Sequence, residues 1–266
     1  MSAAPVALDA ALLHAMGVFA AHKRVLIALD FDGTLAPEVD DPDLARALPA
    51  AQEALVSLRS IPGTTVALVS GRALASLAAV GGLPDDTPLV GSHGLEVRLG
   101  SGDDRPAVDD ADRKRVRTVR SLLEPLVEAT PGAWIEDKPA GFAVHTRVVD
   151  PVVASGLTER VRAEAFASDA ALTVRYGKNV VEFAVRSVTK GDGLRVLRAQ
   201  FAPDAVLFAG DDVTDEDAFA VLEPGDLGIK VGPAQTIAPF RVEGPASVAH
   251  LLQRLNALRQ SPGRAQ

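Results

Sequence analysis

The stretch Arg24-Val25-Leu26-Ile27-Ala28-Leu29-Asp30-Phe31-Asp32-Gly33-Thr34-Leu35 decides how the chain folds. Its first half is a continuous run of apolar, mostly branched residues, which is typical of a strand buried on both faces of a parallel sheet. Two carboxylates, Asp30 and Asp32, end that run. Open α/β sheets place their chemistry at the carboxyl ends of such strands. Two carboxylates this close stay ionised together only beside a cation, and oxygen ligands favour magnesium.

The composition limits the classes of function. The chain has 266 residues, 47% hydrophobic and 4% aromatic, so we expect a large aliphatic core. A formal net charge of -8 argues against nucleic acid or an anionic membrane as a partner, but it permits an anionic substrate beside a local cation. The absence of cysteine excludes disulfides and thiolate catalysis. Because residues 10–21 form an uncharged segment too short to span a bilayer, we expect a soluble, cytoplasmic protein.

Strands and helices alternate near both ends of the chain, which predicts βαβ units and a parallel sheet with helices on both faces. The strands predicted in this alternating part are residues 24–30, 65–69, 89–92, 205–209 and 227–231. Between them the order changes to α-β-β-α-β-β with hairpins. We therefore predict a core domain of residues 1–102 and 186–266, and an inserted smaller domain of residues 103–185.

Polar residues follow three of the predicted core strands, and a lysine opens one of the helices. These residues are Asp30, Asp32, Ser70, Lys190, Asp211, Asp212 and Asp215. Because the carboxyl ends of parallel strands meet at one edge of a sheet, we expect these side chains to lie close together. Magnesium and an ammonium group neutralise phosphate oxygens, which a hydroxyl and backbone N–H groups then hold. A carboxylate can then attack phosphorus and form an aspartyl-phosphate.

The same residues resemble a known superfamily. Asp30-Phe31-Asp32-Gly33-Thr34-Leu35, then Ser70, Lys190 and Gly210-Asp211-Asp212-Val213-Thr214-Asp215, are similar in order to the four motifs of the haloacid dehalogenase (HAD) superfamily. The resemblance implies a HAD-like Rossmannoid α/β core with a parallel sheet. It also implies that the inserted segment is a C2-type α/β cap domain, which excludes water and contacts the substrate.

The resemblance implies a catalytic role for four of these residues. Asp30 is the expected nucleophile of a phosphatase, a hydrolase that cleaves phosphate esters. Asp32 is expected to protonate the leaving oxygen and then to deprotonate the attacking water. Ser70 and Lys190 are expected to bind the phosphoryl group. Two alternatives remain open, since Ser70 also suits a helix N-cap and Lys190 alone would be an ordinary surface lysine.

The resemblance also implies a magnesium site. Asp30, Asp211 and the backbone carbonyl of Asp32 are the expected ligands, with Asp212 or Asp215 in the outer coordination shell. Asp212 and Asp215 have an alternative role, because an acid at the start of a helix caps it and interacts favourably with its dipole.

Further segments resemble the trehalose-6-phosphate phosphatases within this superfamily. The matching segments are Gly210-Asp211-Asp212-Val213-Thr214-Asp215-Glu216, Ser92-His93-Gly94-Leu95-Glu96, Glu136-Asp137-Lys138 with His145 and Arg147, and Gly177-Lys178-Asn179-Val180-Val181-Glu182. The predicted substrate-binding residues are Arg72, His93, Glu136, Lys138, Arg147, Lys178 and Glu182. Charged groups suit a disaccharide, because they bond several hydroxyls at once. The chain departs from the family at Thr146, where an aromatic residue is often found.

Alternatives remain for both residues and function. His93 also suits a purely structural role beside a glycine turn, and Glu136, Lys138 and Glu182 also suit cross-strand ion pairs. A HAD phosphatase for another sugar phosphate, such as sucrose phosphate or mannosylphosphoglycerate, shares the core motifs. A phospho-receiver signalling domain shares the acids, magnesium and lysine, but it lacks a cap. We expect a magnesium-dependent monomer of trehalose biosynthesis whose partner is a small sugar phosphate.

Overall fold

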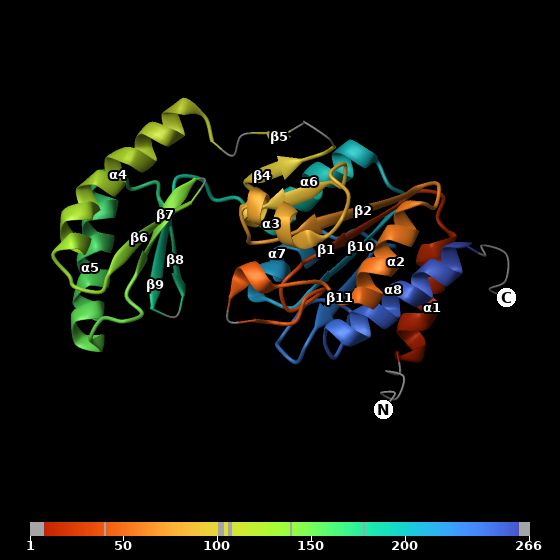
Figure 1. Ribbon diagram of the computed structural model, residues 1–266. Coiled ribbons are helices and arrows are strands. Elements are labelled where there is room, and N and C mark those ends of the chain that lie inside the picture. The colour runs from red at the N-terminus through yellow and green to blue at the C-terminus, as the bar shows by residue number, and fades with distance from the viewer. Residues whose placement is uncertain are drawn as a thin grey trace. The chain divides into compact units, whose positions relative to one another are not determined.

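The computed structural model describes residues 8–39, 41–100, 104–105, 108–138, 140–177 and 179–260. The chain divides into two compact units, one of Met1–Arg105 with Thr189–Gln266 and one of Pro106–Val188 (Figure 1). Below, these are called unit 1 and unit 2. The two boundaries predicted from the sequence, after residues 102 and 185, fall slightly earlier than these.

Unit 1 is built on an eight-stranded, mostly parallel sheet with the strand order β12-β11-β10-β1-β2-β3-β4-β5. In the described part of the chain, the strand pairs of this sheet are parallel except β3–β4 and β4–β5, which are antiparallel. This sheet confirms the predicted HAD-like α/β fold class. Its strands are β1 (Val25–Leu29), β2 (Thr64–Val69), β3 (Leu89–Gly91), β4 (Glu96–Arg98), β5 (Asp104–Arg105), β10 (Ala205–Gly210), β11 (Leu227–Val231) and β12 (Phe240–Val242).

Helices cover both faces of this sheet (Figure 1). Every residue of β1 is buried, and its side chains alternate between two hydrophobic clusters. Val25, Ile27 and Leu29 belong to a cluster that includes residues of α1, α2, α3 and α8, whereas Leu26 and Ala28 belong to one that includes residues of α6 and α7. The helices are α1 (Ala10–Ala21), α2 (Pro49–Arg59), α3 (Leu74–Gly81), α6 (Lys190–Phe201), α7 (Glu216–Phe219) and α8 (Pro245–Gln260).

The edges of the unit 1 sheet hold three strands that the sequence analysis missed. Strands β4, β5 and β12 have 3, 2 and 3 residues. Alternation over so few residues gives no periodic signal. Helix α1 begins at Ala10, while residues 1–7 lie outside the described part of the chain.

Unit 2 pairs two helices with a four-stranded antiparallel sheet of order β6-β7-β9-β8. Helices α4 and α5 lie on the same face of this sheet (Figure 1). Phe142, Val144, Val181 and Phe183 are buried, and their alternation along β7 and β9 marks the face that packs on the helices. The elements are α4 (Asp110–Glu128), β6 (Trp134–Lys138), β7 (Gly141–His145), α5 (Pro151–Ser168), β8 (Thr173–Gly177) and β9 (Val180–Ala184).

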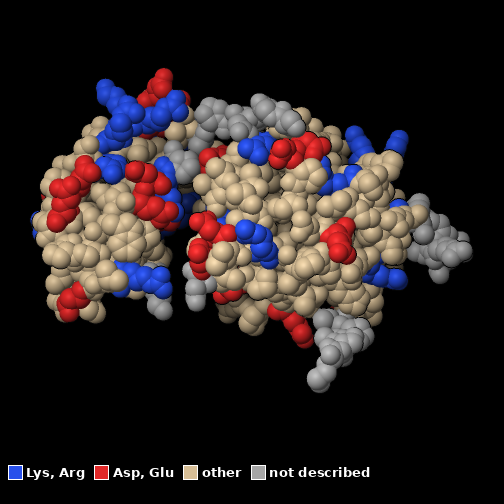
Figure 2. All heavy atoms as spheres, viewed as in Figure 1, with Lys and Arg blue, Asp and Glu red and all other residues tan. Residues whose placement is uncertain are grey.

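The surface charges fit the composition. Arg113, Lys114 and Arg117 are exposed on α4, and Figure 2 shows basic residues gathered over this helix beside acidic ones. The basic residues of α4 thus lie on a solvated face of the helix. The acids Asp110 and Asp112 in its first turn complement the helix dipole. Among the residues that the structure describes, no helix combines the length and the apolar character that a membrane crossing requires.

Candidate active site

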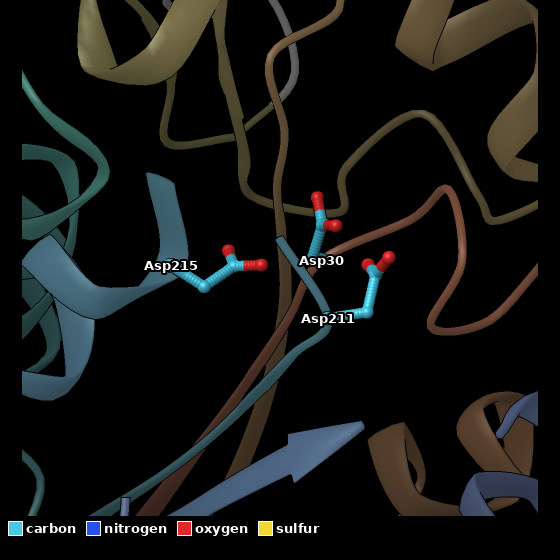
Figure 3. Close-up of side chains that lie close together, drawn as sticks. All are labelled: Asp30, Asp211 and Asp215. Carbon is cyan, nitrogen blue, oxygen red and sulfur yellow. The ribbon is translucent and has the colours of Figure 1, made fainter. Parts of the chain in front are cut away.

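Three carboxylates meet where β1 and β10 end. The two strands run parallel and side by side, so Asp30 and Asp211 leave the sheet at the same edge. The short helical turn Val213–Asp215 then brings Asp215 back toward them. One oxygen from each of Asp30, Asp211 and Asp215 lies within 4.8 Å of the others (Figure 3). Oxygen ligands at this spacing suit a divalent cation such as Mg²⁺.

Two glycines make this close approach possible. Gly33 has a φ of +70°, and a Cβ built there would lie 2.1 Å from a carboxylate oxygen of Asp211. A Cβ at Gly210 would lie 2.2 Å from the carboxyl carbon of Asp215. Both distances are far below van der Waals contact, so the positions of Asp211 and Asp215 depend on the absence of these side chains.

A buried lysine lies inside the acidic cluster. Lys190 is the first residue of α6, whose start is fixed by a capping box between Thr189 and Asp192. Its side chain is only 3% exposed, and its Nζ lies 2.9 Å from Asp30 Oδ1 and 2.7 Å from Asp215 Oδ1. Lys190 is therefore not the ordinary surface lysine of the alternative interpretation.

Burial and mutual repulsion shift the titration of the cluster. Burial raises the pKa of Asp30 to about 6, although Lys190 opposes the shift. Burial and the charge of Asp30 raise the pKa of Asp215 to about 6. Burial and Asp215 raise the pKa of Asp211 as well. Burial acts to lower the pKa of Lys190, but the charges of Asp30 and Asp215 outweigh it and the net shift is upward. One ammonium group thus leaves three carboxylates under-neutralised, which fits an additional cation.

The second carboxylate of the opening motif has a different partner. Asp32 accepts two hydrogen bonds from Arg72, from Nε at 2.5 Å and from Nη2 at 2.6 Å. Arg72 also lies over the ring of Phe31, with its Cζ 5.6 Å from the ring centroid. This bidentate pair fixes the orientation of Asp32. Among the described residues, the Asp32 side chain is outside the group of three that could hold a metal.

Asp212 points elsewhere than its neighbours in the motif. Its side chain accepts a hydrogen bond from Thr214 Oγ1 at 3.1 Å, and its backbone N–H donates to Asp215 Oδ2 at 2.8 Å. Asp215, rather than Asp212, therefore lies next to Asp30 in the described structure. A place for Asp212 in the outer coordination shell of the metal stays a prediction.

The turns after β2 and β3 are bonded to each other. Ser70 is 2% exposed, and its Oγ accepts a hydrogen bond from the backbone N–H of Arg72 at 3.2 Å. His93 has a φ of 57° and donates its backbone N–H to the Ser70 carbonyl at 3.0 Å. Its ring packs against Gly71, where a Cβ would lie 2.5 Å from the ring. These contacts fit the structural alternative for His93, and its contact with substrate stays a prediction.

Two residues of the site escaped the sequence analysis as functional candidates. Thr34 is fully buried and donates from Oγ1 to Asp211 Oδ1 at 3.1 Å. Lys230, near the end of β11, is also fully buried, and its Nζ donates to the Asp212 carbonyl at 2.9 Å and to Glu216 Oε1 at 3.2 Å. A lysine inside an otherwise apolar strand was the available signal, because burying a charge without a purpose is costly.

The predicted substrate residues of unit 2 include one compact group. Glu136 accepts a hydrogen bond from Lys138 Nζ at 2.6 Å and forms another with His145 Nε2 at 2.8 Å. Glu136 and Glu182 both lie opposite Ala143, so they share one face of the sheet. Arg147, with His145, Asn179 and Val180, lines a hollow of about 440 Å³. Lys178 lies outside the described residues.

A mostly parallel sheet with these strand-end acids and a buried lysine defines a haloacid-dehalogenase-like α/β protein. Comparison with known sequences narrows the class. Residues 28–246 match the trehalose-phosphatase family. The chain belongs to this family and is a phosphoric monoester hydrolase, which excludes the phospho-receiver alternative.

Individual relatives agree with the family. The trehalose-phosphate phosphatase of Mycobacterium tuberculosis is 35% identical, over 100% of this chain and 69% of that protein. The bifunctional trehalose-6-phosphate synthase/phosphatase of Thermoproteus tenax is 35% identical over 89% of this chain, but the match spans only 32% of that longer protein. The structure of Aspergillus fumigatus trehalose-6-phosphate phosphatase superposes with a TM-score of 0.72 at 29% identity, over 96% of this chain and 99% of that chain.

Proposed function

We propose that this protein hydrolyses trehalose 6-phosphate to trehalose and phosphate, with Mg²⁺ as cofactor and through an aspartyl-phosphate intermediate. The observation that carries the proposal is the meeting of Asp30, Asp211, Asp215 and Lys190 at the strand ends of a trehalose-phosphatase-family chain. Carboxylates with a lysine suit a transferred phosphoryl group, since its charge must be neutralised while a nucleophile attacks.

In the first step, a carboxylate oxygen of Asp30 attacks phosphorus, and the bond between phosphorus and the sugar oxygen breaks. Asp32 gives its proton to that oxygen, and trehalose leaves as a neutral alcohol. Arg72 holds Asp32 by two hydrogen bonds, which supports a fixed position for this carboxyl group. Lys190 and the Ser70 hydroxyl hold the phosphoryl oxygens.

In the second step, Asp32 takes a proton from water, whose oxygen attacks phosphorus of the phosphorylated Asp30. The bond between phosphorus and the Asp30 oxygen then breaks, and inorganic phosphate leaves. Asp30 returns as a carboxylate and Asp32 as an acid, so the cycle closes without a further reagent.

Asp30 and Asp211, with the carbonyl of Asp32, would hold Mg²⁺, and Asp215 or Asp212 would contact it through water. Bound there, the ion would supply positive charge against the phosphoryl oxygens. The fit rests on three carboxylate oxygens within 4.8 Å and on the raised pKa values of Asp30, Asp211 and Asp215.

For the sugar, we propose contacts from Glu136, Lys138, Arg147 and Glu182 of unit 2. The face of the unit 2 sheet that turns away from α4 and α5 is called the open sheet face below. Its exposed charged groups, Glu136 and Lys138, support this role, because each can bond more than one hydroxyl. Arg72, His93 and Lys178 remain predicted substrate-binding residues.

The proposal is tested by phosphate release from trehalose 6-phosphate, sucrose 6-phosphate, glucose 6-phosphate and p-nitrophenyl phosphate, with Mg²⁺ and with EDTA. We expect the highest kcat/KM for trehalose 6-phosphate and loss of all turnover in EDTA. A higher kcat/KM for sucrose 6-phosphate would assign the chain to the other sugar phosphatases. Full activity in EDTA would remove the metal from the proposal.

A further inference from the structure

The open face of the unit 2 sheet carries an aromatic pair that no predicted role uses. Trp134 and His145 are directly opposite each other on β6 and β7. Their rings stack nearly parallel, with centroids 4.6 Å apart and an interplanar angle of 6°. The strand register puts them on the same face as Glu136, because residues two apart on a strand point the same way.

The stack is continuous with the charged group beside it. The His145 ring bonds Glu136 through Nε2 at 2.8 Å, and Lys138 bonds the other oxygen of Glu136 at 2.6 Å. Indole, imidazole, carboxylate and ammonium therefore form one connected array. Each member limits the movement of the next, so the indole is held in a defined orientation although it is at the surface.

Trp134 remains 44% exposed despite the stack. The exposed part of the indole adds no apolar burial to the fold, and large aromatic rings kept at a surface often mark a binding site. The adjoining hollow of about 440 Å³, lined by His145, Arg147, Asn179 and Val180, is large enough for part of a small ligand.

A glucose ring matches this combination of groups. Its hydroxyls are mostly equatorial, so each broad face of the ring presents C–H groups that pack on an aromatic ring, while the edge presents hydroxyls. Glu136 accepts from such hydroxyls and Lys138 donates to them. We propose that Trp134, oriented by His145, is the packing platform for a glucose ring of the disaccharide substrate and determines specificity for it. This inference rests on the proposed function.

The sheet offers a matched control residue. Tyr176 on β8 is 61% exposed, and it is the only tyrosine of the chain. It lies opposite Val181, which is buried on the helix-covered face, so Tyr176 belongs to the other face of the same sheet. Tyr176→Ala removes a ring of similar exposure away from the array.

The test compares Trp134→Ala, Trp134→Phe and Tyr176→Ala with the wild type. The measured quantity is the ratio of kcat/KM for trehalose 6-phosphate to kcat/KM for p-nitrophenyl phosphate, which has no sugar. We expect Trp134→Ala to lower this ratio at least tenfold, mainly through KM for the sugar phosphate. Trp134→Phe should recover part of the loss, because a ring is restored, and Tyr176→Ala should leave the ratio unchanged.

A second readout does not depend on turnover. Trp134 is the only tryptophan in the chain, so tryptophan fluorescence reports on this site alone. Titration of the wild type and of Tyr176→Ala with trehalose should change the emission with the same saturation curve, whereas an equal concentration of glycerol should not.

The outcomes separate this inference from the proposed function. An unchanged substrate ratio in a folded Trp134→Ala variant, or emission that trehalose leaves unaltered, would overturn the platform while trehalose-6-phosphate hydrolysis stands. A wild type that fails to hydrolyse trehalose 6-phosphate would overturn the function itself. Trp134→Phe keeps the test valid if Trp134→Ala does not fold.

Discussion

The strand-end cluster of unit 1 and the open sheet face of unit 2 both hold acids paired with bases, but in opposite surroundings. Asp30, Asp215 and Lys190 are at most 4% exposed, whereas the side chains of Glu136 and Lys138 are 45% and 40% exposed. Water screens the exposed pair but not the buried group. We therefore expect the paired acids and bases to govern stability and chemistry in unit 1. In unit 2 we expect them to govern only the selectivity for the sugar part of the substrate.

The largest effect on activity is expected for the substitution Asp30→Asn in the buried cluster of unit 1. The amide keeps the shape of the side chain but cannot attack phosphorus, so we expect turnover of every phosphate ester to fall by at least ~10⁴-fold. Phosphate release measures it, and circular dichroism checks the fold. Wild-type turnover in this variant would show that another residue is the nucleophile.

Lys190→Met should produce the largest loss of stability. It leaves Asp30 and Asp215 buried without their cationic partner, and we expect the free energy of unfolding to fall by ~3–5 kcal/mol in metal-free protein. Urea titration measures the change. The control is Arg195→Met on the same helix, where the exposed pair with Asp192 predicts a loss below ~1 kcal/mol. Equal losses in both variants would contradict the contrast between buried and exposed pairs.

Lys230→Met tests what holds the loop between Asp211 and Asp215. Without the buried ammonium group, the Asp212 carbonyl and Glu216 lose a hydrogen-bond donor. We expect Mg²⁺ affinity to weaken ~10-fold, because groups that orient ligands tune metal binding. Isothermal calorimetry measures this affinity. The control variant is Lys23→Met, which removes an exposed lysine of the same unit. Unchanged affinity in Lys230→Met would assign this lysine to stability alone.

The raised pKa values predict how pH acts on unit 1. Asp30 and Asp215 titrate at about 6 in the native protein against an ordinary value of 3.8, so the folded state binds protons more tightly than the unfolded state. The free energy of unfolding of metal-free protein should therefore fall as pH rises from about 4 to about 6.

In the proposed metal site, Mg²⁺ would compete with those protons. Its affinity should be constant above pH 7 and should weaken ~10-fold or more per pH unit below about 6. Calorimetry at pH 7.5, 6.0 and 5.0 measures this. An affinity that is independent of pH would exclude Asp30 as a ligand of the ion.

The smallest effect on stability is expected for Glu136→Ala. Its exposed pairs with Lys138 and His145 predict a loss below ~1 kcal/mol. In contrast, kcat/KM for trehalose 6-phosphate should fall ~10-fold relative to p-nitrophenyl phosphate. A matched change is Glu159→Ala, which removes an exposed ion pair with Arg162 on α5. Equal losses on both substrates would remove Glu136 from sugar recognition.

The fold and the acidic cluster were predictable from the sequence because buried strands appear in it as continuous apolar runs. The apolar run of β1 ends abruptly at Asp30, and a charge there is costly unless it is used. Lys190 was identified only by its place in the motif order, since a lysine at a helix start is ordinary by itself. The strands at the sheet edges were too short for any periodic signal.

The rest depends on contacts between distant parts of the chain. Asp215 rather than Asp212 turns toward Asp30, in a loop bonded to Lys230 of the next strand. The stack of Trp134 on His145 requires the register of β6 on β7, which the residues alone do not give. A single exposed tryptophan at the start of a short strand carries no periodic signal.

The least replaceable positions of the catalytic unit have no functional group. At Gly33 and Gly210 even a methyl group would collide with a carboxylate of the acidic cluster, so we expect alanine, which is mild at most positions, to be strongly disruptive here. We therefore expect these two glycines to tolerate substitution as poorly as Asp30, the proposed nucleophile. A saturation library scored for activity would show them as gaps beside Asp30 and Asp211.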